Sequence, residues 1–314
     1  MAFQIPILII AWRRPELLRA LLRALRPFRP EFLYVACDGP RDGFEADSER
    51  VLTTRYVFES EIDWPCRLQR LYSNINYGCR LGPVRAIDWF FSHVEEGIIL
   101  EEDCIPSKEF LPFCAELLEF YRHDHRIWCI GGVNFQQRIR SGGFSYYFSR
   151  YNHCWGWASW RRCWKNFDLE MTQWPVFCKS GLINSLFPAQ RERRYWLRAW
   201  TQTYDKSVPV TWWDYQWAFA CMANSGLTVL PNVNLVSNIG FGPDASHTLI
   251  APSTVRRANA GSRVSFRCLP MTHPSFVVAD EEADSYTFRH HFKGTYVRRF
   301  FNRLMKLSSA LGWC

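Results

Sequence analysis

The sequence contains no long apolar runs, no zinc-type cysteine pairs and no internal repeats. No stretch approaches the roughly 20 consecutive apolar residues that a membrane-spanning helix needs, so we expect no transmembrane segment. The 12 cysteines include no Cys-x-x-Cys pair, which argues against a structural zinc site of the usual spacing. Several cysteines lie inside apolar runs, as in residues 34–37 and 127–130, where a thiol serves as a small buried side chain.

The first residues also lack the pattern of a secretory signal. They enter an apolar strand directly, without a basic stretch followed by an apolar core. Together with the cysteine usage, this predicts a reduced, cytoplasmic protein.

The composition is rich in aromatic residues and carries a net positive charge. With 48% hydrophobic residues, a chain of 314 residues can bury a sizeable core. The 15 tryptophans could fill that core or line a groove for sugar rings, and composition does not separate the two. The net charge of +8 suits an anionic ligand such as a pyrophosphate, or an anionic membrane surface. No nucleic-acid-binding module is recognisable, so we expect no nucleic-acid partner.

The first 133 residues alternate between short apolar runs and amphipathic stretches. We predict strands at residues 5–11, 32–37, 67–72, 97–100 and 126–133, and helices at residues 15–25, 44–60, 82–93 and 108–122. Such alternation is typical of a mostly parallel sheet with right-handed crossovers and helices on its faces. The predicted fold is therefore α/β and Rossmann-like.

The pattern changes after residue 134. Residues 136–164 are dense in Tyr and Trp and show less alternation, so we predict loops there. Helices are expected at residues 190–204 and 213–223, and a strand at 227–230. We predict a nucleotide-sugar-binding half (residues 1–133), an aromatic-rich acceptor-binding and catalytic half (134–285) and a basic amphipathic segment (286–314). The two halves are expected to pack together without a linker.

Polar residues follow the predicted strands of the first half. Ligands of such sheets bind at the carboxyl ends of the strands, where Arg13 and Arg14, Asp38, residues 74–78 and the triplet 101–103 should converge. The triplet Glu101-Glu102-Asp103 offers the hard oxygen ligands that a divalent cation bridging two phosphates requires. We therefore predict an Mn²⁺ or Mg²⁺ site there, although acidic runs are often only solvated surface.

The order of these segments resembles the GT-A glycosyltransferases, and more closely N-acetylglucosaminyltransferase I and its bacterial relatives. The matching segments are Ile5–Arg14, Val35–Gly39, Ile99–Asp103, Trp212–Trp217 and the loop Ser237–Thr248. The triplet departs from the family's more frequent Glu-Asp-Asp, and the family's signal anchor is absent.

The resemblance implies an inverting, metal-dependent transfer of an N-acetylhexosamine or hexose from a UDP-sugar to a hydroxyl of a glycan or glycolipid. It implies that Asp103 binds the metal, that Asp38 reads the uracil and that Asp214 is the catalytic base. The remaining residues assigned to binding of the donor and its cofactor are Arg14, Glu101, Glu102, Ser246 and His247. A bacterial surface polysaccharide or a lipid-linked glycan is the acceptor that we expect.

The residues themselves leave alternatives open. Asp214 could instead cap a helix that begins at Tyr215, because Asp is a favoured N-cap residue. As a base, it would be desolvated by flanking tryptophans such as Trp213, which would raise its pKa. His153, with Trp155 and Trp157, could form an acceptor platform, although a histidine in an aromatic segment is more often packed in a core.

Two other functions are compatible with the sequence. A sugar-nucleotide nucleotidyltransferase also places an acidic metal site in an α/β sheet, but it would lead us to expect a Gly- and Lys-rich loop where residues 11–15 lie. A non-catalytic sugar-binding protein would account for the aromatic residues. The C-terminal stretch 296–311 places basic and bulky apolar residues at helical spacing. It could contact the inner face of a membrane as a peripheral helix, or dock on the domain.

Overall fold

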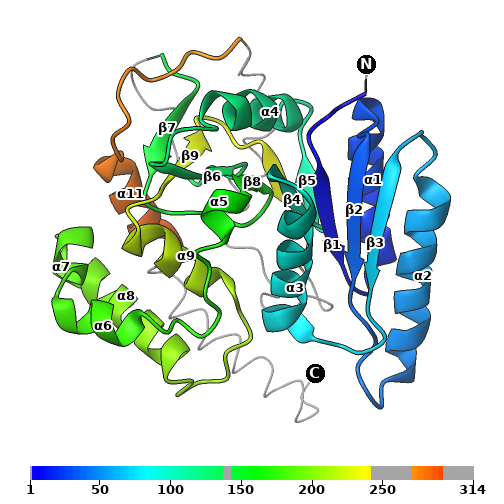
Figure 1. Ribbon diagram of the computed structural model, residues 1–314, viewed down its shortest axis with the longest axis horizontal. Helices are drawn as coiled ribbons and strands as arrows, with labels where there is room; N and C mark the ends of the chain where they lie inside the picture. Colours follow the sequence, from blue (N-terminus) through cyan, green and yellow to red (C-terminus); the bar gives the residue numbers. More distant parts are fainter. Residues whose placement is uncertain (1, 137–142, 242–269, 293–314) are drawn as a thin grey trace, which may run out of the picture.

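The computed structural model describes residues 2–136, 143–241 and 270–292 (Figure 1). Its centre is one eight-stranded sheet in the order β3-β2-β1-β4-β8-β6-β9-β7. The predicted α/β, Rossmann-like fold with a mostly parallel sheet is confirmed. Strands from both sides of residue 134 belong to this one sheet.

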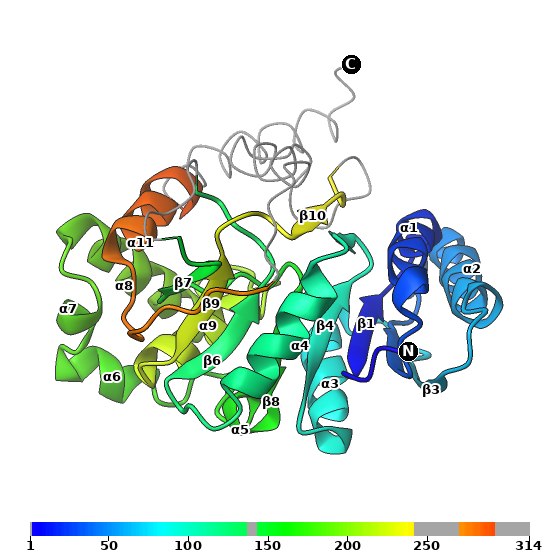
Figure 2. The same cartoon turned by 90° about the horizontal axis from the view of Figure 1, so that it is seen from above.

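The first four strands follow the alternation expected from the sequence. They are β1 (Ile7–Ala11), β2 (Phe32–Cys37), β3 (Arg67–Tyr72) and β4 (Glu96–Glu101). The connecting helices are α1 (Pro15–Leu25), followed by the short η1 (Arg26–Phe28), then α2 (Glu45–Glu61) and α3 (Gly78–His93). β1 pairs in parallel with both β2 and β4. Figure 2 shows α1 and α2 together on one face of this part of the sheet and α3 on the other.

The other half of the sheet is mixed. It consists of β6 (Ile127–Gly131), β7 (Tyr146–Ser149), β8 (Trp157–Trp160) and β9 (Leu227–Pro231). β8 lies between β4 and β6 and runs antiparallel to both. The prediction of loops over residues 144–164 is therefore wrong. Every residue of β7 and β8 is buried, so four-residue strands with no exposed face leave no alternation to detect.

A second, two-stranded sheet holds the connection after β4. β5 (Cys104–Pro106) pairs antiparallel with β10 (Val236–Asn238). The backbone amide of Ile239 donates to the carbonyl of Asp103 at 2.9 Å, which extends this contact to the loop after β10. Two segments more than 130 residues apart are thereby fixed side by side.

The remaining helices cover the sheet or form a separate group. They are α4 (Phe110–Phe120), α5 (Arg161–Trp164), α6 (Trp174–Ser180), α7 (Ile183–Leu186), α8 (Gln190–Tyr204), α9 (Asp214–Ala223), α11 (Glu281–Thr287) and the π-helix η2 (Phe288–Phe292). Figure 1 shows α6, α7 and α8 grouped at the end of the molecule opposite α2. The expectation that a helix begins at residue 108 is two residues early, since α4 begins at Phe110.

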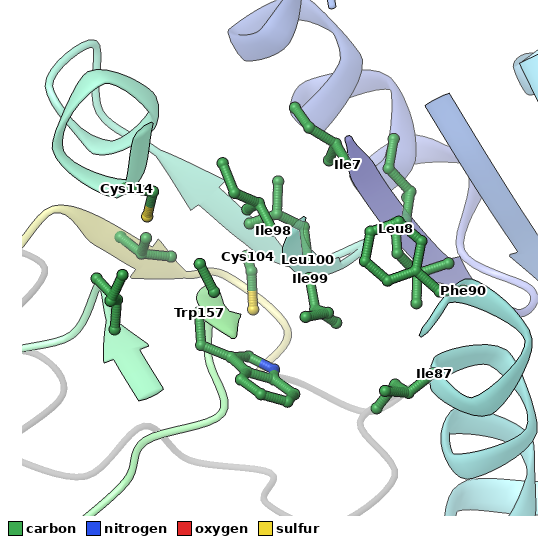
Figure 3. Packing of buried hydrophobic residues seen from close by; sticks show 14 of the residues in the cluster. Ile7, Leu8, Ile87, Phe90, Ile98, Ile99, Leu100, Cys104, Cys114 and Trp157 are labelled. Atoms are coloured by element: carbon green, nitrogen blue, oxygen red, sulfur yellow. The ribbon is translucent and has the colours of Figure 1, made fainter. Parts of the chain in front are cut away.

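The core is built from continuous apolar strands and bulky helix residues. Ile98 and Leu8, on neighbouring strands, are fully buried, and Phe90 of α3 points toward Leu8 (Figure 3). Most tryptophans are also buried. Trp157, Trp164 and Trp217 form one cluster, with ring centroids of Trp164 and Trp217 5.2 Å apart. The aromatic richness therefore serves the core first, and Trp157 lies in that core and not on an exposed platform.

Two further expectations concern cysteines and membranes. Every cysteine in the part of the chain that the structure describes is a free thiol, and Cys37 and Cys129 are buried as expected. Among the same residues, no helix has both the length and the apolar character needed to cross a bilayer.

Candidate active site

The carboxyl ends of β1 and β4 bring one arginine and two carboxylates together. β1 and β4 are parallel neighbours, so the residues that follow them emerge at the same edge of the sheet. Arg14 follows β1 and directly precedes Pro15, the first residue of α1. Glu102 follows β4, and its backbone amide donates to the carbonyl of Ile10 in β1 at 3.0 Å. The predicted convergence of Arg14 with the acidic triplet is thus present in the structure.

Arg14 bridges the two carboxylates with separate nitrogens. Its Nε donates to Oε1 of Glu102 at 2.6 Å, and its Nη2 donates to Oδ2 of Asp103 at 2.8 Å. The side chains are 14%, 7% and 9% exposed for Arg14, Glu102 and Asp103 respectively, so the whole cluster is desolvated. An arginine fork in this geometry makes two charge-assisted hydrogen bonds and fixes both partners in place.

The pKa values of this cluster reflect burial opposed by charge pairing. Burial by itself would lower the pKa of Arg14, but Glu102 and Asp103 together raise it above its ordinary value. The pKa of Glu102 is raised by burial in spite of the neighbouring Arg14. The site therefore holds one fixed positive charge against a pair of carboxylates.

Glu101 is the third carboxylate of the triplet and lies at the end of β4. Its pKa is raised to about 8, first by burial and then by the negative charges of Asp103 and Glu102. The negative charge of Asp214 also raises the pKa of Glu101, by a smaller amount. Asp214 therefore lies close enough to act electrostatically on this cluster.

The loop after β10 closes directly on the cluster. A Cβ at Gly240 would stand 1.9 Å from Oδ2 of Asp103 and 2.9 Å from Nη1 of Arg14. Nδ2 of Asn238 donates to Oδ1 of Asp103 at 3.4 Å, while Oδ1 of Asn238 accepts from the amide of Gly240 at 2.9 Å. Asn238 and Gly240 lie in the loop 237–248 that resembles the family's, but neither was predicted as a site residue. The Gly-Phe-Gly run at 240–242 was the signal for a close backbone approach.

Asp38 has a role in the fold that the sequence did not indicate. Its carboxylate accepts hydrogen bonds from the backbone amides of Gly39, Tyr77 and Gly78, at 2.9–3.0 Å. It therefore satisfies amides at the start of α3, while burial raises its pKa in spite of these bonds. The assignment of Asp38 to a uracil base stays a prediction.

Asp214 lies at the first position of α9, after the N-cap residue Trp213. The alternative that Asp214 caps a helix beginning at Tyr215 is therefore wrong by one residue. The expectation that flanking tryptophans bury Asp214 is also wrong, because Asp214 is exposed while Trp213 and Trp217 turn into the core. Ser246, His247 and the C-terminal stretch 296–311 lie outside the described residues.

A divalent cation at this site would need further oxygen ligands from the phosphates of a bound substrate and from water. Within residues 2–136, 143–241 and 270–292, no group of three or more His, Cys, Asp or Glu side chains is arranged to hold a metal. Mg²⁺ is commonly held by one or two carboxylates together with substrate phosphates and waters. Glu102 and Asp103 are adjacent carboxylates of this kind, so the donor set fits such a cation, with Arg14 as the positive group now facing them.

Comparison with known proteins gives only distant structural matches. No protein-family model and no curated protein sequence matches the chain. Among solved structures, the inositol-1-phosphate CTP transferase from T. maritima matches at 10% identity, covering 85% of this chain and 98% of that one, with a TM-score of 0.36. A putative glucose-1-phosphate thymidylyltransferase from Bacillus anthracis matches at 9% identity over 83% and 96%, with a TM-score of 0.36. A UDP-glucose pyrophosphorylase matches at 8% identity over 74% and 90%, with a TM-score of 0.34.

These matches correct the main functional prediction. The structures just named are nucleotidyltransferases, so the prediction of a UDP-sugar glycosyltransferase is contradicted, and the alternative of a nucleotidyltransferase fits them better. A specific relation to N-acetylglucosaminyltransferase I is likewise not supported. At such low identities and TM-scores the likeness concerns the course of the chain, so a function has to be argued from the site itself.

Proposed function

We propose that the chain is a metal-dependent sugar-phosphate nucleotidyltransferase, which joins a nucleoside triphosphate and a sugar phosphate to give a nucleotide sugar and pyrophosphate. The observation that carries this proposal is the buried bridge from Arg14 to Glu102 and Asp103 at the carboxyl ends of β1 and β4. One site thereby offers an arginine for phosphate oxygens and carboxylates for a divalent cation.

The residues around the bridge suit a polyphosphate. The guanidinium of Arg14 has five N–H donors, and its two carboxylate bonds use only Nε and Nη2. Arg13, next to it, contacts Asp47, with Nη1 3.2 Å from Oδ1. A nucleotidyltransferase is expected to have a Gly- and Lys-rich phosphate loop at this position, and the chain has adjacent arginines there instead. An arginine fork can bind phosphate with two parallel hydrogen bonds.

The reaction needs no general base. A phosphate oxygen of the sugar phosphate attacks the α-phosphorus of the nucleoside triphosphate, and the bond from that phosphorus to the bridging oxygen breaks. Pyrophosphate leaves with the electron pair. A bound Mg²⁺ or Mn²⁺ would neutralise charge on the phosphates. Arg14 would hold phosphate oxygens, and the loop at Gly240 would exclude water from one side of the site. In this reaction Asp214 is not needed as a catalytic base.

The direct test is a pyrophosphate-release assay on the full chain. Five nucleoside triphosphates (ATP, CTP, GTP, UTP and dTTP) are each combined with glucose, galactose, mannose and N-acetylglucosamine 1-phosphates in the presence of Mg²⁺ or Mn²⁺. We expect release from one selective pair, abolished by EDTA and reduced at least 100-fold in Asp103→Asn. Asp63→Asn is the matched control, because Asp63 is half-exposed and pairs with Arg26 at the surface.

Two results would count against the proposal. Absence of pyrophosphate release from every combination would contradict nucleotidyl transfer. Release that Asp103→Asn leaves unchanged would place the chemistry elsewhere in the molecule.

A further inference from the structure

A cavity of about 100 Å³ lies beside the acidic cluster and is not used by the chemistry above. An enclosed water needs about 10–15 Å³ of such space, so the cavity has room for several waters or for one ring-sized ligand. Its walls come from Phe135, the segment 152–155, α8, α9 and η2. The lining residues include the aromatic side chains Phe135, Trp155, Trp196, Tyr215 and Phe292.

His153 lines this cavity and is only 7% exposed. Its Nε2 has no hydrogen-bond partner among the residues that the structure describes. The ring packs edge-on against Phe135, with centroids 4.7 Å apart, and Phe135 in turn stacks on His291. A buried polar atom without a partner costs about 1–3 kcal/mol, and a hydrogen-bonding ligand in the cavity would remove this cost.

The charge state of His153 restricts what that partner can be. Burial, and then the neighbouring His291, lowers the pKa of His153 to about 3, so its ring is neutral at physiological pH. Among the described residues that line the cavity, Asp214 is acidic and none is Lys or Arg. An anion would therefore face the Asp214 carboxylate without a permanent cation among these residues, so an uncharged group suits this lining better than a phosphate does.

Asp214 links the cavity to the acidic cluster. It is an exposed residue that lines the cavity, and its charge acts on both Glu101 and Cys154. A carboxylate accepts hydrogen bonds from hydroxyl groups, and Asn152 in the wall offers both a donor and an acceptor. A ligand ring that contacts Asp214 would thus lie on the side of the cavity nearest Glu101.

From this arrangement we propose that the cavity binds an uncharged monosaccharide ring, with Nε2 of His153 and the carboxylate of Asp214 contacting its hydroxyl groups. The aromatic walls match the apolar C–H faces of a pyranose, and the polar atoms match its edge. The inference rests on the proposed function. The cavity would bind the sugar ring of the sugar phosphate, and the phosphate would bind outside the cavity, near Arg14.

The test measures binding of free sugars to the full chain without nucleotide or metal. Saturation-transfer NMR is run with glucose, galactose, mannose and N-acetylglucosamine at millimolar concentration. We expect one of these sugars to bind, and His153→Phe, which keeps an aromatic ring but removes the polar atom, to weaken binding at least tenfold. Ala218→Leu, which fills the cavity from α9 without removing a polar group, should weaken it similarly. His123→Phe, at an exposed position, is the matched control.

The outcomes separate this inference from the proposed function. Sugar binding that depends on His153, in a protein that releases no pyrophosphate, would retain the cavity and reject nucleotidyl transfer. Pyrophosphate release with an unchanged KM for the sugar phosphate in both His153→Phe and Ala218→Leu would reject the cavity and retain the reaction. Binding of uridine or cytidine at the cavity, or no binding of any of the four sugars, would also overturn the inference.

Discussion

The backbone of Gly240 lies against the carboxylate of Asp103 so closely that a Cβ there would stand 1.9 Å from Oδ2. The two residues are 137 positions apart in the sequence, and pairing of β5 with β10 brings them together. The contact closes one side of the cluster formed by Arg14, Glu102 and Asp103. It makes residue 240 a position where any side chain would disturb the cluster.

We predict that Gly240→Ala will disrupt the acidic cluster without unfolding the protein. The added methyl group would collide with the carboxylate of Asp103, and moving that carboxylate breaks its hydrogen bond with Arg14. We expect a fall of at least tenfold in pyrophosphate release and in nucleotide affinity, with an unchanged circular dichroism spectrum. Ile239→Ala, one residue earlier and half-exposed, is the control. Full activity of Gly240→Ala would mean that the loop stands away from the site during turnover.

Replacing Arg14 should destabilise the protein and make it responsive to metal. Arg14→Gln leaves two buried carboxylates without their cation, which costs about 3–5 kcal/mol in the free energy of unfolding. Mn²⁺ should recover much of this loss, because it supplies positive charge to Glu102 and Asp103. Thermal unfolding with and without 1 mM Mn²⁺ measures the effect. Arg26→Gln, which breaks an exposed pair with Asp63, should change little in either condition. Equal Mn²⁺ responses of Arg14→Gln and the native chain would exclude these carboxylates as ligands.

Glu101 should make the metal-free protein less stable as the pH rises. Its folded pKa of about 8 lies above its ordinary value of 4.5, so the folded state retains a proton that the unfolded state releases between these values. Stability is therefore unaffected below pH 4.5, falls through this window and levels off above pH 8. Glu101→Gln removes the effect and should be more stable than the native chain by about 2–4 kcal/mol at pH 8. Urea unfolding at pH 5 and pH 8 tests this, with the exposed Glu49→Gln as control. A stability gain that is the same at both pH values would contradict the prediction.

His153 should make the protein less stable as the pH falls into the acidic range, whereas Glu101 makes it less stable as the pH rises. Its folded pKa of about 3 lies below its ordinary value of 6.5, so protonation favours the unfolded chain between these values. The stability is complete above pH 6.5 and is lost as the pH falls toward 3, by about 1.4 kcal/mol per pH unit. We expect His153→Phe to lose about 2 kcal/mol less than the native chain between pH 7 and pH 5. Urea unfolding at these two pH values checks the difference. Parallel losses in the two proteins would mean that His153 is solvated or paired.

The first half of the fold could be predicted because each element carries its own local signal. β2 and β3 have the predicted bounds, since Phe32–Cys37 and Arg67–Tyr72 are short strand-like runs between recognisable helices. The strands of the second half could not be predicted, because they lack such a local signal. β8 lies in the middle of the sheet with both faces buried, so Trp157–Trp160 has no polar alternation to identify it as a strand.

The sequence alone determined that Arg14 and the triplet 101–103 would meet, because residues that follow parallel strands emerge at one edge of a sheet. It did not determine what these residues contact. The bridge from Arg14 to Glu102 and Asp103, the amides bound by Asp38, and the closure by Gly240 depend on side-chain directions and on the pairing of distant segments. The cavity at His153 is decided by tertiary structure to an even greater degree. Its walls come from five separate stretches of the chain, and the burial that lowers the pKa of His153 exists only when they are packed together.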